Sequence, residues 1–183
     1  MKFWPEKKWK KMVIIVLIAF TIIVASLSGF TIFKINNDYV DEIDVLNANG
    51  SQTALIIYHP GFSSFMKDTS YAFAEGLVEN DWKVEITTAS SQAPTDLSDY
   101  SLLVLGSGVY ADDPSPTIKR HVERIGDLQS IDTVLLITSG FGRGTAESQM
   151  QQTVEEHNGI IKDVLSVSQD DPLDIVKQSG IEY

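Results

Sequence analysis

The chain has 183 residues, 43% hydrophobic and 9% aromatic, so it is too apolar to be disordered and long enough for one domain with a core. It contains no cysteine, which excludes disulfides, thiolate metal sites and a cysteine nucleophile. Residues 1–34 hold six lysines and one acid (a charge of +5), whereas residues 35–183 hold 8 basic and 24 acidic side chains (−16), so we expect no nucleic-acid partner.

The first predicted element is a membrane-spanning helix. Met12–Phe33 is a run of 22 residues without charge, interrupted only by two threonines and two serines. At about 1.5 Å per residue the run would reach roughly 33 Å, enough to cross the apolar core of a bilayer. Lysines cluster before the run and acidic residues follow it. The positive-inside rule therefore predicts a single-pass protein of the cell membrane, with a cytoplasmic N-terminus and an extracytoplasmic domain.

The apolar run divides the chain into four parts. These are a basic segment (residues 1–11), the transmembrane helix (12–33), a polar linker (34–52) and a domain (53–183). A cleaved signal peptide is the alternative, because a basic start and an apolar stretch fit both. A signal core is usually about 7–15 residues long, and the small residues of Ala25–Ser28 make a mediocre cleavage site, so we favour the uncleaved anchor.

Residues 53–183 alternate between strand and helix patterns. Short apolar runs predict five strands: Thr53–Tyr58, Val84–Thr88, Leu102–Leu105, Thr133–Thr138 and Ile160–Val167. Apolar residues at helical spacing predict helices within residues 66–80, 116–125, 146–157 and 172–180. Such alternation favours an α/β fold, in which helices cover both faces of a parallel sheet.

Ligands of such sheets bind beyond the carboxyl ends of the strands, so the loops after the first, third and fourth strands hold the candidate binding residues. After the first strand these are Pro60, Gly61, Phe62, Ser63 and Ser64. The glycine permits a tight turn, the serines offer hydroxyls, and free amides at the start of a helix attract an anion such as phosphate. A plain turn with a helix cap is the alternative.

The other two loops combine small residues with one aromatic side chain each. After the third strand come Ser107, Gly108, Val109, Tyr110 and Ala111, and after the fourth come Ser139, Gly140, Phe141 and Gly142. Small residues permit close approach of the backbone, and an aromatic ring offers a flat face to a planar ligand. A surface tyrosine and a flexible glycine loop are the alternatives.

The sequence shows no motif for metal binding, nucleophilic catalysis or phosphate binding by a Walker lysine. His59, His121 and His157 show no metal-ligand spacing, so each is interpreted as a surface or cap residue and no metal site is predicted. His121, between Arg120 and Arg124, is placed on the solvated face of its helix. Because no nucleophile elbow or Walker lysine is present, no catalytic residue is named.

A family resemblance runs through three stretches. They are Ala54–Leu77 (ALIIYHPGFSSFMKDTSYAFAEGL), SLLVLGSGVYADDPSPTIKRHVERIGDL and TVLLITSGFG, which together resemble the flavodoxin-like family over about residues 53–168. The resemblance implies a doubly wound, five-stranded parallel sheet of strand order 2-1-3-4-5 with flavin mononucleotide (FMN) as ligand. It places the phosphate on residues 60–65 and the flavin ring between residues 107–114 and 139–143. Phe65 stands where the family usually has a closing threonine.

Three functions are compatible with this resemblance. The first is a membrane-anchored, FMN-binding protein of electron transfer, which would need a redox partner protein or a small acceptor. The second is a flavodoxin-domain oxidoreductase acting on a quinone or tetrapyrrole-type acceptor, and the third is a flavin-free interaction domain. If flavin binds, Asp112 and Asp113 should disfavour its anionic reduced form and lower its midpoint potential.

Overall fold

The computed structural model describes residues 7–139 and 145–183. The chain divides into two compact units, Met1–Lys34 and Ile35–Tyr183. Nearly all of the described part of the first unit belongs to helix α1 (Lys8–Asn36), which extends beyond the predicted apolar run at both ends and buries none of its side chains. In the described residues, α1 is the one helix that is long and apolar enough to cross a membrane.

The described part of the second unit is built on one seven-stranded sheet. Its strands are β1 (Asp44–Leu46), β2 (Gln52–Tyr58), β3 (Trp82–Thr88), β4 (Leu102–Tyr110), β5 (Asp113–Pro114), β6 (Asp132–Ser139) and β7 (Ile160–Ser168). They are ordered β1-β3-β2-β4-β6-β7, and β5 pairs with β4 away from this path. All pairs along β3-β2-β4-β6-β7 are parallel, whereas β1 pairs with β3, and β5 with β4, in the antiparallel sense.

The prediction of a five-stranded, wholly parallel sheet of order 2-1-3-4-5 is therefore wrong for the sheet as a whole. It omits β1, which lies within the predicted linker, and β5, which lies within the predicted loop after the third strand. Both strands are too short to carry an alternation of apolar and polar residues. β4 also continues to Tyr110, beyond the predicted end at Leu105, because its small residues still pair with β6 as far as Gly108.

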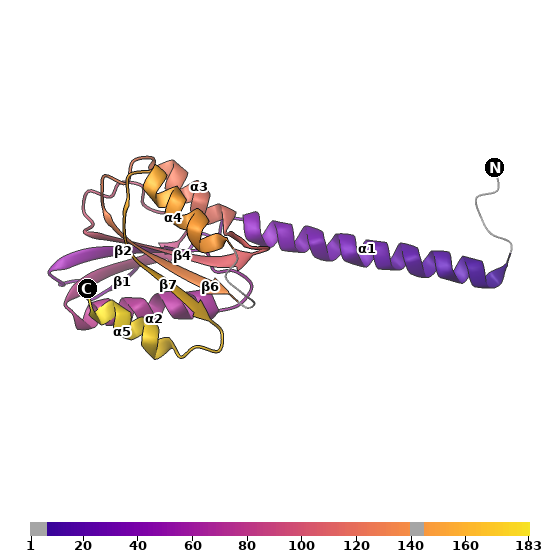
Figure 1. Cartoon of the computed structure of the whole chain (residues 1–183), viewed down its shortest axis with the longest axis horizontal. Coiled ribbons are helices and arrows are strands. Elements are labelled where there is room, and N and C mark those ends of the chain that lie inside the picture. The colour runs from indigo at the N-terminus through magenta and orange to yellow at the C-terminus, as the bar shows by residue number, and fades with distance from the viewer. Residues whose placement is uncertain (1–6, 140–144) are drawn as a thin grey trace. The chain divides into compact units, whose positions relative to one another are not determined.

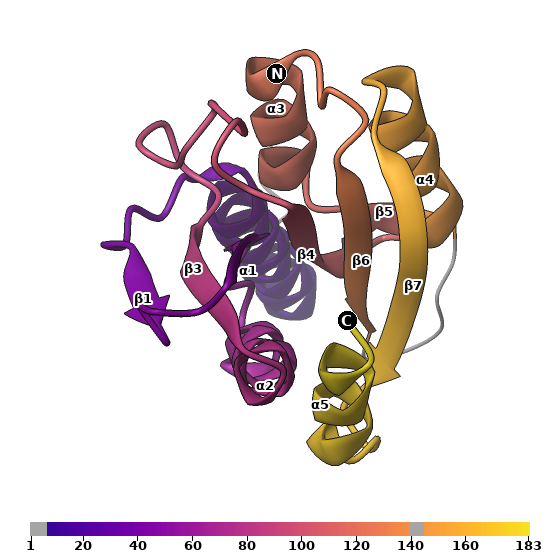
Figure 2. The same cartoon turned by 90° about the vertical axis from the view of Figure 1, so that its left-hand side faces the viewer.

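Four helices cover the sheet, where the spacing of apolar residues predicts them: α2 (Phe65–Glu79), α3 (Pro116–Ile125), α4 (Ala146–Glu156) and α5 (Leu173–Ile181). α2 and α5 lie on one face, and α3 and α4 on the other (Figure 1, Figure 2). In β2, Ile56 belongs to the core beneath α2 and α5, whereas Leu55 and Ile57 belong to the core beneath α3 and α4. A strand buried on both faces is apolar throughout, as the sequence of β2 is.

The pair α2 and α5 packs closely at two glycines. A Cβ atom on Gly76 would lie 2.1 Å from the carbonyl oxygen of Lys177, and one on Gly180 would lie 2.4 Å from the carbonyl oxygen of Phe73. Neither position can hold a side chain unless α5 moves away. This close crossing fixes the position of α2 relative to α5. The first turn of α2 lies at the carboxyl end of β2.

Candidate functional site

A cavity of about 260 Å³ lies at the carboxyl edge of the sheet, beyond the ends of β2, β4 and β6. The neighbouring strands β2 and β4 lead into helices on opposite faces, α2 and α3 (Figure 2). This change of face is the topological switch point at which doubly wound sheets bind their ligands. The position of the cavity therefore follows from the topology.

The cavity brings most of the described candidate residues together. It is lined by Pro60, Gly61, Phe62, Ser63, Gly108, Val109, Tyr110 and Ser139. Ser64, Ser107 and Ala111 do not line it, and Gly140, Phe141 and Gly142 lie outside the described residues.

Four further residues line the cavity: Phe65, Met66, Thr138 and Gln169. Phe65 lies within residues 60–65, on which the family resemblance places the phosphate. Met66 lies in a predicted helix and Thr138 ends the fourth predicted strand, so sequence reasoning assigned both to regular structure. Gln169 follows β7, whose loop was not considered as part of the site. Its position at the carboxyl edge, beyond a parallel strand, is the signal that could have revealed it.

The loop between β2 and α2 leaves the start of the helix open. Gly61 has a φ of +69°, a conformation that favours glycine. The N-cap residue, Ser64, makes no capping hydrogen bond, because its hydroxyl donates to the carboxylate of Asp68 at 2.8 Å. Among the described residues, the N–H groups of Met66 and Lys67 have no acceptor. Unpaired amides at a helix N-terminus can bind an anion, although Asp68 partly offsets their positive potential.

The turn after β4 explains why two candidates face away from the cavity. The Ser107 hydroxyl accepts a hydrogen bond from the Ser115 N–H at 2.8 Å and donates to the Gly108 carbonyl, so it holds the start of α3. Ala111 and Asp112 have φ angles of 50° and 69° and form the exposed turn between β4 and β5. Neither residue is a glycine or an asparagine, the types most typical of a positive φ, so the residue types alone did not predict this conformation.

Tyr110 lies over the loop that precedes α2. Its ring is 5.9 Å from that of Phe62 and 6.0 Å from that of His59, both edge to face, and its hydroxyl is 3.4 Å from His59 Nδ1. A Cβ atom on Gly61 would come within 2.7 Å of this hydroxyl. Burial, together with nearby Tyr39, raises the pKa of the Tyr110 phenol to about 12, so the hydroxyl stays protonated at neutral pH.

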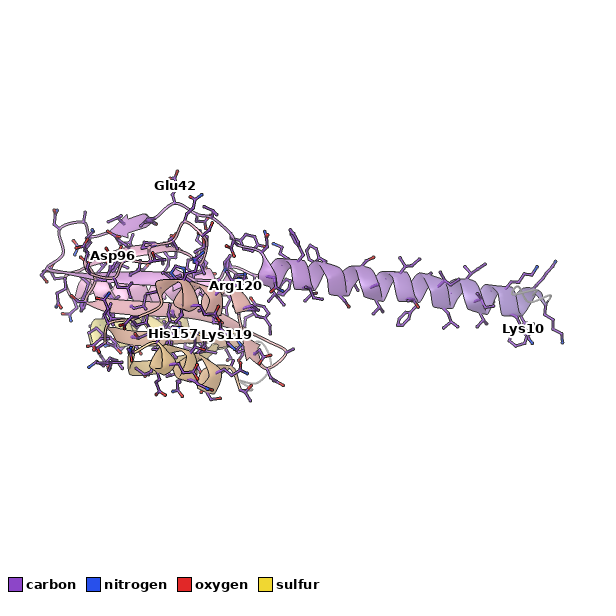
Figure 3. All side chains as sticks on the ribbon, turned by 90° about the horizontal axis from the view of Figure 1, so that it is seen from above. Lys10, Glu42, Asp96, Lys119, Arg120 and His157 are labelled. Atoms are coloured by element: carbon purple, nitrogen blue, oxygen red, sulfur yellow. The ribbon has the colours of Figure 1, made fainter. Side chains whose placement is uncertain are left out.

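The interpretation of the histidines is confirmed for one of the three. His157 is the C-cap residue of α4, and its Nδ1 lies 2.7 Å from the carbonyl oxygen of Thr153 (Figure 3). His59 and His121, in contrast, are buried. His121 follows Ile118 by three residues, a spacing that already places it on the buried face of α3. Burial, helped by the Arg124 guanidinium that it contacts, lowers the pKa of His121 to about 4.

The parallel strands β3-β2-β4-β6-β7 form a doubly wound sheet whose order, numbered among themselves, is 2-1-3-4-5, and this chain therefore has a flavodoxin-like fold. A flavodoxin from Bacillus cereus is 16% identical with a TM-score of 0.59, and the match covers 72% of this chain and 96% of that one. An archaeal flavodoxin is 15% identical with a TM-score of 0.56, covering 71% and 94% of the two chains.

A larger protein contains the same fold as a part. A flavodiiron core from Synechocystis is 13% identical with a TM-score of 0.61, and the match covers 74% of this chain but only 35% of that one. No family model and no curated protein matches the sequence. At these identities the likeness defines the fold, and the function has to be argued from the site.

Proposed function

We propose that the chain is a membrane-anchored, FMN-binding protein of electron transfer. The observation that carries the proposal is the cavity at the switch point, with the open N-terminus of α2 on one side and the ring of Tyr110 on another. A two-electron reduced flavodoxin from Megasphaera elsdenii has a similar structure, with a TM-score of 0.59 and 11% identity.

The residues around the cavity fit FMN. The Ser63 hydroxyl and the N–H groups of Met66 and Lys67 would hold the phosphate, since they are donors at a helix N-terminus. Tyr110 and Val109 would hold the flavin ring through flat and apolar contacts. Phe65 replaces the threonine of the family and lines the cavity, which leaves Ser63 as the residue of this loop that offers the cavity a hydroxyl group. When bound, FMN supplies the redox chemistry, and the chain binds and orients it.

The charge around the site favours a low midpoint potential. Asp112 lies in the turn after Tyr110, and Asp113 pairs with Tyr110 as the first residue of β5, where its carboxylate accepts a hydrogen bond from Gln149. Both acids belong to a unit with a charge of −16. Negative charge near a flavin disfavours the anionic reduced state, so the proposed protein is a strong electron donor.

The anchor part of the proposal rests on α1. It is long and apolar enough to cross a bilayer, and lysines cluster at its N-terminal end. By the positive-inside rule, the N-terminus lies in the cytoplasm and the flavodoxin-like domain outside it. Protease added outside intact cells should digest the domain, and full protection would refute this orientation.

The proposed ligand is tested with the full-length chain in detergent. The purified protein should carry a flavin absorbance spectrum, or should quench the fluorescence of added FMN at a one-to-one ratio. Riboflavin, which lacks the phosphate, should bind more weakly if the start of α2 is the phosphate site. A colourless protein that leaves FMN fluorescence unchanged would overturn the proposal and leave a flavin-free interaction domain.

A further inference from the structure

The segment Asp38–Leu46 is attached to β3 at two places. Its C-terminal end is the strand β1, in which Asp44 pairs with Ile86 in the antiparallel sense. Nearer its start, the Asp41 N–H donates to the Thr88 hydroxyl and the Asp41 carbonyl accepts from the Thr87 hydroxyl, both at 3.2 Å. Because Thr87 and Thr88 are the last residues of β3, the segment reaches the carboxyl edge of the sheet.

At that edge, Tyr39 begins a row of aromatic contacts that ends at the cavity. The Tyr39 ring lies 5.8 Å from the His59 ring at an angle of 60°, and the His59 ring lies 6.0 Å from the Tyr110 ring at 82°. Tyr110 lines the cavity. The segment before β1 therefore reaches the cavity through a single intermediate side chain.

The backbone of the intermediate residue, His59, is held in place. His59 is fully buried, and its N–H donates to the Gly106 carbonyl at 3.0 Å, which continues the ladder between β2 and β4. The His59 imidazole contacts the rings of both Tyr39 and Tyr110, and these contacts bear on its orientation. Its orientation in turn sets the place of the Tyr110 hydroxyl, 3.4 Å from Nδ1.

We propose that Tyr39 is a positioning residue of the cavity: its ring fixes the His59 imidazole, which fixes Tyr110, so that ligand affinity depends on the attachment of residues 38–46 to β3. The choice of FMN as ligand rests on the proposed function. The positioning of His59 and Tyr110 by Tyr39 does not rest on that function. A site whose side chains are already ordered loses less conformational entropy when the ligand binds, so its affinity is higher. One edge-to-face ring contact is worth about 3- to 10-fold in an equilibrium constant.

The coupling acts in both directions. If the attached segment favours FMN binding, bound FMN favours attachment by the same factor. The Asp41 N–H reports attachment, because it donates to Thr88 only when the segment lies on β3. Bound FMN should therefore slow hydrogen exchange at this amide, while the amides of α4 on the far side of the sheet keep their rates.

The test uses the full-length chain in detergent with three substitutions. Tyr39→Ala removes the ring, Tyr39→Phe keeps it, and Val40→Ala changes the exposed neighbour, 50% of whose surface is accessible. The probes are the FMN dissociation constant and the imidazole resonances of ¹⁵N-labelled histidine, of which the chain has three. Tyr39→Ala should weaken FMN binding about 3- to 10-fold and shift the resonances of His59 but not those of His121 or His157. Tyr39→Phe and Val40→Ala should match the wild type.

Three results would overturn the inference. The first two are unchanged His59 resonances in Tyr39→Ala, and equal effects of Val40→Ala and Tyr39→Ala on FMN affinity. Loss of affinity in Tyr39→Phe as well would show that the hydroxyl acts rather than the ring, which also contradicts the proposal. If the wild-type chain binds no FMN, the proposed function fails. The ¹⁵N resonances of His59 in the ligand-free protein then decide whether Tyr39 positions it.

Discussion

The helices α2 and α3 begin at the carboxyl ends of the neighbouring strands β2 and β4, but their N-termini are built differently. In α3 the N-terminus is capped, and we call it closed: the Ser115 hydroxyl accepts from the Thr117 N–H, and Pro116 has no N–H to satisfy. In α2, whose N-terminus we call open, the Ser64 hydroxyl donates to Asp68 instead, and among the described residues the N–H groups of Met66 and Lys67 have no acceptor. The closed end belongs to the packed interior, and the open end borders the cavity.

The comparison shows how one repeated motif can serve either stability or binding. A helix N-terminus whose donors are satisfied by its own residues gains stability but has nothing to offer a ligand. One whose donors are left open is less stable by itself and gains when an anion binds. Experiments on the two helices should therefore separate stability from affinity.

The largest expected effect concerns His121, the buried titratable residue of α3. Its pKa is lowered to about 4, so between pH 6.5 and pH 4 the unfolded chain binds a proton that the folded chain does not. The free energy of unfolding is therefore highest above pH 6.5. It falls by about 3 kcal/mol in total as the pH falls towards 4. Urea unfolding across this range should show the loss in the wild type.

The matched variant for this prediction is His121→Gln, which cannot titrate. Its free energy of unfolding should vary less between pH 7 and pH 4 than that of the wild type, by about 3 kcal/mol. Equal pH profiles for the two proteins would mean that His121 does not carry the acid sensitivity. Flavin affinity at pH 7 should be the same in both, because α3 is not part of the cavity.

The second largest effect concerns Gly61, which lies in the loop between β2 and α2. Gly61→Ala places a side chain at a φ of +69° and 2.7 Å from the Tyr110 hydroxyl, so we expect FMN affinity to fall about tenfold or more. Gly126→Ala is the control, because Gly126 ends α3 with a φ of +79° and open space around it. Both variants should lose about 1–2 kcal/mol of stability, and only Gly61→Ala should show weaker binding in a fluorescence titration.

The third effect compares the two N-cap serines directly. Ser115→Ala removes a buried cap and should lower the free energy of unfolding by about 1 kcal/mol. Ser64→Ala removes no cap and should change it by less than about 0.5 kcal/mol. Urea unfolding of the two variants measures both values, and a larger loss for Ser64→Ala would reverse the assignment of the closed and open ends.

The smallest effect concerns the charge beside Tyr110. Replacing Asp112 and Asp113 by asparagine removes two charges at roughly 10 Å from the proposed flavin, which in water is worth about 0.8 kcal/mol. For a two-electron couple this raises the midpoint potential by about 10–20 mV. Redox titration of the FMN-loaded protein checks the shift. Asp96→Asn and Asp99→Asn, in the loop before β4, form the matched control and should shift it less.

The sequence predicted the fold well where the signal was long and apolar. Thr53–Tyr58 and Thr133–Thr138 are continuous buried strands, and such runs identify the centre of a parallel sheet. It failed where pairing depends on distant partners. The strand β1 has three residues, none of them buried, and becomes visible only through its hydrogen bonds to β3.

For the site, the sequence located the loops but not the direction of each side chain. Ser107 and Gly108 are adjacent in β4, but only Gly108 lines the cavity, and the Ser107 hydroxyl accepts from the Ser115 N–H instead. This bond joins residues eight positions apart, and the sequence pattern does not indicate it. The roles of Tyr39 and His59 depend on contacts between segments 20 or more positions apart, for which one sequence offers no periodic signal.

The short strand β1 also has a consequence for self-association. Without it, β3 would present seven residues of unpaired backbone at the sheet edge, a template on which a second copy could pair. If α1 anchors the chain in a membrane, as proposed, copies of the chain would meet often and would encounter such an edge. β1 replaces it with an edge of three residues that begins with Asp44 and follows Asp41 and Glu42. Short, acidic edges disfavour pairing with their own copies, so the segment that reaches the cavity also protects the edge of the sheet.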